Sequence, residues 1–220
     1  MSTQARRSVT KAAPASGRGI FWIEIMTKKL KVAVLISGRG TNLQSLIDAC
    51  QEPVFPAEII AVISNVAGVA GLERAKKVGI KTHVIEHKKF KNREEFDGAL
   101  HDLIASTGAE FICLAGFMRL LTPGFVNKWP GRIINIHPSL LPDFKGAHAH
   151  RDVIAAKAKK SGCTVHYVIP EMDAGETILQ REVPVYPDDT EETLAARVLE
   201  QEHIAYPEAL RIVAESLLQM

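Results

Sequence analysis

A short segment in the second half of the chain, Asn135-Ile136-His137-Pro138, carries the residues best suited to chemistry. It follows Ile133-Ile134, and β-branched apolar residues of this kind are typical of a buried strand. Strand side chains alternate, so we expect Asn135 and His137 on the same side of the strand. Pro138 disfavours helical geometry at His137. The pattern therefore predicts an amide and an imidazole presented together at the end of a strand.

Asn135 and His137 suit the stabilisation of negative charge and the movement of protons. An amide donor can hold a developing oxyanion, and an imidazole can donate to it or transfer protons. A carboxylate such as Asp173, in the polar segment 169–175, can orient the imidazole and favour its charged form. The chain has no Gly-x-Ser-x-Gly nucleophile motif. This set indicates acyl transfer between two bound substrates, with satisfied core groups as the plainer alternative.

The histidines also admit a second interpretation, as ligands of a metal ion. A His-x-His pair presents both rings on one side only in a strand, whereas His148 and His150 are predicted to open a helix. The chain has no HExxH motif and no cysteine cluster. We therefore expect no metal at the residues that this interpretation would use, which are His137, His148, His150, His166, Glu171 and Asp173.

A glycine-rich segment, Ser37-Gly38-Arg39-Gly40-Thr41-Asn42, lies between an apolar run at 31–36 and a helical pattern. Strand, glycine turn and helix aim backbone N–H groups at an anion. A dinucleotide site would need a third glycine where Leu43 stands and an acid where Ser64-Asn65 stand. A P-loop would need Gly-Lys-Ser/Thr, which is absent. A site for one small phosphate remains, with a plain tight turn as the alternative.

These segments need a scaffold of alternating strands and helices, and the sequence predicts an α/β fold. Strands alternating with helices indicate a doubly wound, mostly parallel sheet with helices on both faces. Ligands bind such sheets at the carboxyl ends of the strands. The predicted strands are 31–36, 58–64, 81–85, 111–115 and 133–136, and the predicted helices between them include 71–78 and 93–106.

The last third of the chain predicts a different arrangement. After a helix to about Ala158, the segments 164–168 and 178–185 are expected to form antiparallel strands. Asp189-Thr190-Glu191-Glu192 resembles a capping box that opens a long C-terminal helix. Pro207 should kink or restart that helix.

The composition describes an ordinary globular chain, with 46% hydrophobic and 24% charged residues. Of the 27 Lys and Arg and the 25 acids, seven bases and one acid lie in residues 1–31, which leaves 20 bases against 24 acids. This mildly acidic body argues against nucleic-acid binding. No apolar run approaches the roughly 20 residues that span a bilayer. The three separated cysteines fit a reducing cytoplasm.

Residues 1–26 differ from the rest in being rich in Ala, Ser, Gly and Arg. We expect a disordered leader, or a start upstream of the true initiator at Met26, rather than an organelle transit peptide. Residues 27–220 are expected to form a single domain.

Several segments taken together resemble the folate-dependent formyltransferases. Asn135-Ile136-His137-Pro138-Ser139-Leu140-Leu141-Pro142 is similar to the signature of that family. The resemblance runs in order from about Lys31 onwards and is closest to the branch that formylates glycinamide ribonucleotide in purine synthesis. Its other motifs are Ser37 to Asn42, Ala115 to Arg119, Gly146 to Arg151 and Gln201-Glu202-His203.

The resemblance implies a reaction and a role for each matching residue. Asn135 and His137 would stabilise the oxyanion formed when the glycinamide amine attacks the formyl carbon of 10-formyltetrahydrofolate, and Asp173 would assist. The family uses no metal. Gly40, Thr41, Asn42 and Glu202 would hold the ribonucleotide, whereas the folate site would contain Arg93, Met118, Arg119, Leu120, Leu121, Asn135, Ile169 and Asp173.

Three alternatives stay open beside this interpretation. A methionyl-tRNA formyltransferase would carry a further β-barrel domain and a basic surface, and a formyltetrahydrofolate hydrolase would carry a regulatory domain. A non-catalytic nucleotide-binding module would keep the glycine-rich segment and have no use for Asn135, His137 and Asp173 together. The sequence does not fix the oligomeric state, and a homodimer stays open.

Overall fold

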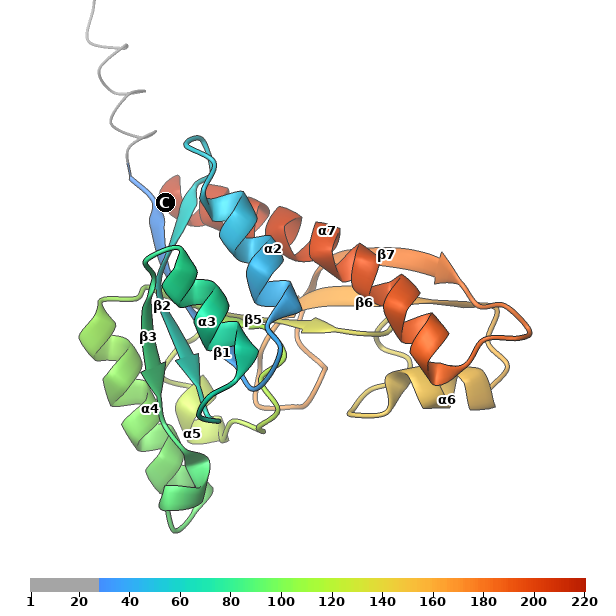
Figure 1. Ribbon diagram of the computed structural model, residues 1–220, viewed down its shortest axis with the longest axis horizontal. Helices are drawn as coiled ribbons and strands as arrows, with labels where there is room; N and C mark the ends of the chain where they lie inside the picture. The colour runs from blue at the N-terminus through green and yellow to red at the C-terminus, as the bar shows by residue number, and fades with distance from the viewer. Residues whose placement is uncertain (1–27) are drawn as a thin grey trace, which may run out of the picture.

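The computed structural model describes residues 28–220, and the leader predicted for residues 1–26 lies outside them. All seven strands of the described chain belong to one sheet, in the order β3-β2-β1-β4-β5-β6-β7 (Figure 1). The strands are β1 Leu30–Ile36, β2 Ala57–Ser64, β3 Lys81–Val84, β4 Phe111–Leu114, β5 Ile133–His137, β6 Lys160–Tyr167 and β7 Thr177–Pro184.

The helices cover both faces of this sheet, as predicted. One face packs against α2 Thr41–Cys50, α3 Ala70–Lys77 and α7 Glu191–Leu218, and the other against α4 Arg93–Thr107 and α5 Pro123–Val126. Two short elements, a 3-10 helix η1 at His87–Lys89 and α6 Ala149–Ala155, complete the set. Each face has its own apolar core, because side chains of the buried strands alternate between the two faces.

The sheet changes strand direction at β5. Strands β1 to β5 are parallel to one another, whereas β6 pairs antiparallel with both β5 and β7. The predicted antiparallel pair is therefore confirmed. Its first strand begins at Lys160 rather than Thr164, because Gly162 lets the backbone of Arg181 approach a stretch that lacks a strand-like pattern.

The expected end of one helix was wrong, and a second helix is continuous at the proline where a kink or a restart was expected. The helix expected to reach Ala158 ends at Ala155, and Lys157 has a left-handed φ of 51° that breaks it. Helix α7 does not restart at Pro207, because buried Tyr206 and Ala209 on either side pack it against the sheet.

Helix α7 begins with a capping box, as predicted, but its second member is Thr193, which lies just beyond the predicted segment 189–192. The Thr190 hydroxyl accepts a hydrogen bond from the Thr193 N–H, and the Thr193 hydroxyl accepts one from the Thr190 N–H.

None of the helices in residues 28–220 is both long enough and apolar enough to cross a membrane.

Gly162→Ala should destabilise the fold by about 3 kcal/mol, because overpacking of this kind strains the core. A Cβ at this position would lie 2.0 Å from the Arg181 carbonyl oxygen, which is backbone and cannot move aside. Gly98→Ala in α4 is the matched control, since its Cβ meets nothing within 4 Å. It should stabilise the protein by up to about 1 kcal/mol. Urea unfolding measures both, and equal stabilities would contradict the close approach.

Candidate active site

The site lies where the connections of the sheet reverse direction. From β1 the chain proceeds outwards through β2 and β3, then returns to place β4 on the other side of β1. Loops at the carboxyl ends of β1 and β4 therefore diverge and leave a crevice, which is where ligands bind in sheets of this kind. The structure brings the glycine-rich segment and the residues after β4 and β5 to this edge.

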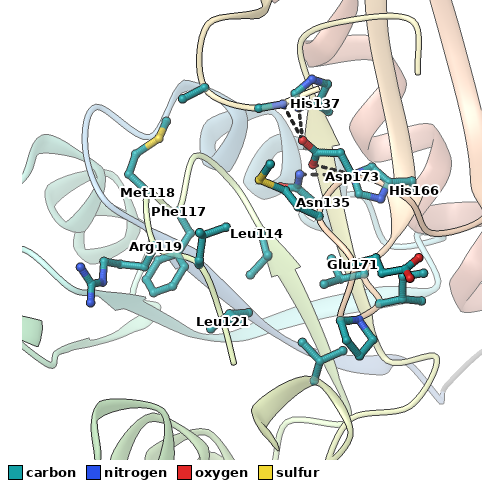
Figure 2. A pocket seen from close by; sticks show the side chains of 18 residues that line it. Leu114, Phe117, Met118, Arg119, Leu121, Asn135, His137, His166, Glu171 and Asp173 are labelled. Carbon is teal, nitrogen blue, oxygen red and sulfur yellow. Dashed lines mark hydrogen bonds and ion pairs between the residues drawn. The ribbon is translucent and has the colours of Figure 1, made fainter. Parts of the chain in front are cut away.

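A cavity of about 420 Å³ opens beside the ends of β4 and β5 (Figure 2). Its wall is largely apolar, and four of its large apolar side chains are exposed: Met118 (77%), Leu120 (54%), Met172 (53%) and Ile169 (39%). Exposed apolar side chains gathered around a concave surface are typical of a ligand site.

The residues predicted for the folate site are brought together, with one exception. Arg93 is the first residue of α4, is exposed and does not line this cavity. Arg119 lines it, while its guanidinium carbon also lies 6.0 Å from the centre of the Phe96 ring. The members that line the cavity are Met118, Arg119, Leu120, Leu121, Asn135, Ile169 and Asp173.

Asn135, His137 and Asp173 meet at one end of the cavity (Figure 2). His137 Nδ1 lies 3.4 Å from Asp173 Oδ2, and both side chains are nearly buried. His137 Nε2 lies 2.9 Å from the Phe144 carbonyl oxygen. A carbonyl only accepts hydrogen bonds, so Nε2 carries a proton and the Nδ1 edge faces the carboxylate.

His166 joins this group, although the sequence motifs pointed to it only as a metal ligand. Its Nε2 lies 3.4 Å from Asn135 Nδ2 and 3.7 Å from Asp173 Oδ1. Asn135 and His166 are partners in the antiparallel register of β5 and β6. The available signal was the alternation of residues 164–168, but the register that makes the pair is set by the tertiary fold.

Burial lowers the pKa of His166, and its hydrogen bond to the Tyr167 carbonyl and the charge of Asp173 oppose this effect only in part. His166 is therefore suited to act as a neutral imidazole between Asn135 and Asp173.

The loop between β6 and β7 is folded so that Asp173 points into the cavity. Asp173 has a φ of 49°, in the left-handed region, and its Oδ2 accepts a hydrogen bond of 2.9 Å from the Gly146 N–H. Gly175 allows the loop to turn back, because a Cβ there would lie 1.8 Å from the Tyr167 carbonyl oxygen. The position of the carboxylate is thus determined by backbone contacts as well as by its own charge.

The exit from β5 is also fixed by hydrogen bonds. The Ser139 hydroxyl donates to the Asp143 carbonyl, and the Thr164 hydroxyl donates to the Ser139 carbonyl. The Thr164 oxygen in turn accepts from the Leu141 N–H. These bonds hold the chain from Pro138 onwards against β6 and so fix the orientation of the His137 backbone.

The residues predicted to hold a ribonucleotide gather at the start of α2. Gly40 caps this helix with a left-handed φ of 69°, and a Cβ there would lie 2.7 Å from the Gly71 Cα. Thr41 is the first residue of α2. Asn42 donates to buried Glu202 of α7 over 2.7 Å, while Asn42 Oδ1 is buried without a partner in the described residues. An anion at this helix N-terminus would be favourably placed.

Within residues 28–220, no group of three or more His, Cys, Asp or Glu side chains is arranged to hold a metal ion. His137, His166 and Asp173 do meet, but as two imidazoles 3.4 Å and 3.7 Å from one carboxylate, beside the Asn135 amide.

Comparison with known proteins identifies the family. The model of the formyl transferase family matches residues 30–210. The chain belongs to this family. Among family members of bacterial origin, it is 45% identical to the phosphoribosylglycinamide formyltransferase of Haemophilus influenzae, covering 86% of this chain and 90% of that protein.

Solved structures of the family share the fold. The glycinamide ribonucleotide transformylase 1 of Symbiobacterium toebii is 44% identical with a TM-score of 0.83, covering 86% of this chain and 89% of that one. The phosphoribosylglycinamide formyltransferase of Brucella melitensis is 47% identical with a TM-score of 0.81, covering 85% and 96%.

A longer relative also matches almost the whole of this chain. The trifunctional purine biosynthetic protein adenosine-3 of Gallus gallus is 51% identical over 99% of this chain, which corresponds to 21% of that protein. The chain thus spans about a fifth of the length of this relative.

Glu202→Gln should raise the melting temperature at neutral pH. Burial raises the pKa of this carboxyl, and the hydrogen bond from Asn42 only partly opposes it. A raised pKa in the folded state means that stability is fully present below the unfolded pKa and is lost as the pH rises through the folded value. The variant should therefore match the wild type at acid pH and exceed it increasingly above the ordinary value of 4.5.

Calorimetry at several pH values from acid to neutral measures this difference. A gap between the two melting temperatures that stays constant with pH would contradict a raised pKa at Glu202.

Proposed function

We propose that this chain transfers the formyl group of 10-formyltetrahydrofolate to the amine of glycinamide ribonucleotide, giving formylglycinamide ribonucleotide and tetrahydrofolate in purine biosynthesis. The observation that carries the proposal is the meeting of Asn135, His137 and Asp173 at one end of an apolar cavity. The names of the relatives that this chain covers almost in full support the same reaction.

The apolar cavity suits the folate, and the start of α2 suits the ribonucleotide. Met118, Leu120 and Ile169 offer contact surface to a flat ring system and its linker. Gly40, Thr41 and Asn42 would bind the phosphate, because backbone N–H groups at a helix N-terminus favour an anion. Buried Glu202 would accept hydrogen bonds from the ribose hydroxyls.

The two substrates would meet at Asn135 and His137. The amine nitrogen attacks the formyl carbon, so a C–N bond forms and the carbonyl oxygen becomes an oxyanion. Asn135 Nδ2 and the His137 ring, through Nδ1 once that nitrogen is protonated, would donate to this oxyanion, which is the charge that such a site must stabilise. Collapse breaks the bond from the formyl carbon to N10 of the folate, and tetrahydrofolate leaves.

Protons must also move, from the attacking amine to the leaving N10. The Asp173 carboxylate lies 3.4 Å from His137 Nδ1, so the pair would accept the first proton and deliver the second. Holding both substrates in line would supply roughly 7–11 kcal/mol of the barrier reduction by itself. No residue of the chain needs to form a covalent intermediate.

We place the reaction in the cytoplasm. The three cysteines of the chain are unpaired, and two of them, Cys113 and Cys163, are buried thiols. Unpaired thiols fit a reducing compartment.

An absorbance assay with 10-formyltetrahydrofolate tests the proposal directly. Folate turnover should require glycinamide ribonucleotide, since the amine is the acceptor. Equal turnover without the ribonucleotide would indicate a hydrolase, and a folded protein without turnover in either case would indicate a binding module.

His137→Ala and Asp173→Asn should each lower kcat by roughly 100-fold or more, because each removes a group that moves protons or supports the oxyanion. Steady-state kinetics measures the loss, and thermal melts show whether each variant is folded. His83→Ala in β3 and Asp143→Asn, whose side chains lie outside the cavity, are the matched controls. A folded variant with near-normal kcat would remove that residue from the mechanism.

Asn42→Ala should instead raise the KM for the ribonucleotide by about tenfold, the effect of one lost hydrogen bond to a charged group. The KM for the folate should change little. A rise in both values would show that Asn42 acts on the whole site rather than on the nucleotide.

A further inference from the structure

Ser37 lies where the loops of the two proposed substrate sites touch. It follows β1 directly and precedes the glycine-rich turn at the start of α2. Its N–H donates to the Gly116 carbonyl oxygen over 3.1 Å, and its hydroxyl oxygen accepts from the Met118 N–H over 2.8 Å. Met118 belongs to the apolar cavity wall. One residue of the glycine-rich segment 37–42, here called the nucleotide loop, therefore supports the backbone of the cavity wall at Met118 to Leu121, here called the folate wall.

The hydroxyl of Ser37 continues into a chain of hydrogen bonds with a defined direction. A backbone N–H can only donate, so the Ser37 oxygen accepts from Met118 and uses its single hydrogen elsewhere. That hydrogen is donated to Asn65 Oδ1, at 2.5 Å. Asn65 is buried, and its Nδ2 lies 3.1 Å from His87 Nδ1. Both sides of the Asn65 amide are thus occupied, and the Ser37 hydroxyl cannot rotate without losing a bond.

The folate wall is held at its other end as well. Buried Asp97 of α4 accepts a hydrogen bond of 2.6 Å from the Thr122 N–H. The cavity-lining residues Met118 to Leu121 lie between this bond and the bond to Ser37. The folate wall is therefore fixed at two points. Because the Thr122 end is held, a shift at the Ser37 end changes the orientation of the whole segment Met118 to Leu121.

The nucleotide loop is equally constrained on its far side. The Gly38 carbonyl oxygen accepts from the Gly71 N–H of α3 over 3.1 Å, and Gly40 also packs closely on α3. A ligand bound at residues 38–42 therefore contacts a loop that is fixed on its α3 side, so a shift that the ligand causes is passed to Ser37. A chain of hydrogen bonds between rigid segments can carry energetic coupling between two sites.

We propose that the Ser37 hydroxyl is a positioning group that couples the two substrate sites, so that the ribonucleotide strengthens folate binding and the folate strengthens ribonucleotide binding. This inference rests on the function proposed above, because it takes the cavity as the folate site and the start of α2 as the phosphate site. The coupling must be equal in both directions, as thermodynamic linkage requires.

Calorimetric titration of tetrahydrofolate, with and without glycinamide ribonucleotide, measures the coupling without turnover. For the wild type we expect the ribonucleotide to tighten tetrahydrofolate binding by about fivefold or more. In Ser37→Ala this factor should fall to about one, and the KM for 10-formyltetrahydrofolate should rise by about tenfold with a smaller change in kcat. Ser37→Thr, which retains the hydroxyl, should restore most of the coupling.

Ser64→Ala is the matched control. Ser64 is a buried serine at the neighbouring strand end, but its hydroxyl bonds only within its own turn, to the backbone of Val66. It should keep the full coupling.

Three outcomes would overturn the inference. The first is undiminished coupling in Ser37→Ala, and the second is an equal loss in Ser37→Thr. The third is a wild type whose affinity for tetrahydrofolate is the same with and without the ribonucleotide, although turnover requires the ribonucleotide. This third outcome would leave the proposed reaction standing. If the wild type binds neither ligand, the proposed function fails and the coupling fails with it.

Discussion

The site depends on the contacts of one carboxylate with three segments of the chain. Asp173 accepts a hydrogen bond from the Gly146 N–H and lies beside the imidazoles of His137 and His166. A nearly buried carboxylate is costly unless such partners compensate for lost water. Its left-handed backbone persists because the surrounding loop determines it, with Gly175 packed on the Tyr167 carbonyl. The charge that we propose for the chemistry is therefore also the charge that assembles the site.

The change of strand direction at β5 makes this assembly possible. Its parallel neighbour β4 brings the apolar cavity wall to the same edge as Asn135 and His137. Its antiparallel neighbour β6 sets His166 opposite Asn135 and ends in the loop that carries Asp173. Parallel neighbours would need a crossover connection, whereas the antiparallel strands β6 and β7 are joined directly by the hairpin loop that carries Asp173. The mixed sheet thus combines a ligand crevice with a returning polar loop.

The parts of this arrangement that follow from local pattern could be predicted from the sequence. Apolar runs indicated the buried strands, and alternation placed Asn135 and His137 on one side. The continuity of α7 through Pro207, by contrast, reflects packing against the sheet, which local propensity does not contain. The pairing of His166 with Asn135 depends on strand register, and the absence of Arg93 from the cavity wall depends on where α4 begins. Strand register and the position of α4 are set by the tertiary structure, so the local sequence pattern does not contain them.

Helix α7 carries two groups of the site region one turn apart. Glu202 reaches Asn42, and the fully buried Tyr206 donates its hydroxyl hydrogen to the carbonyl oxygens of Leu114 and Ile134 on adjacent strands. These residues follow the whole sheet in the chain, so a ribosome makes them after every strand. A growing chain that has completed β7 still exposes the apolar face that α7 covers. During synthesis, that face is prone to aggregation until α7 has been made and packs over it.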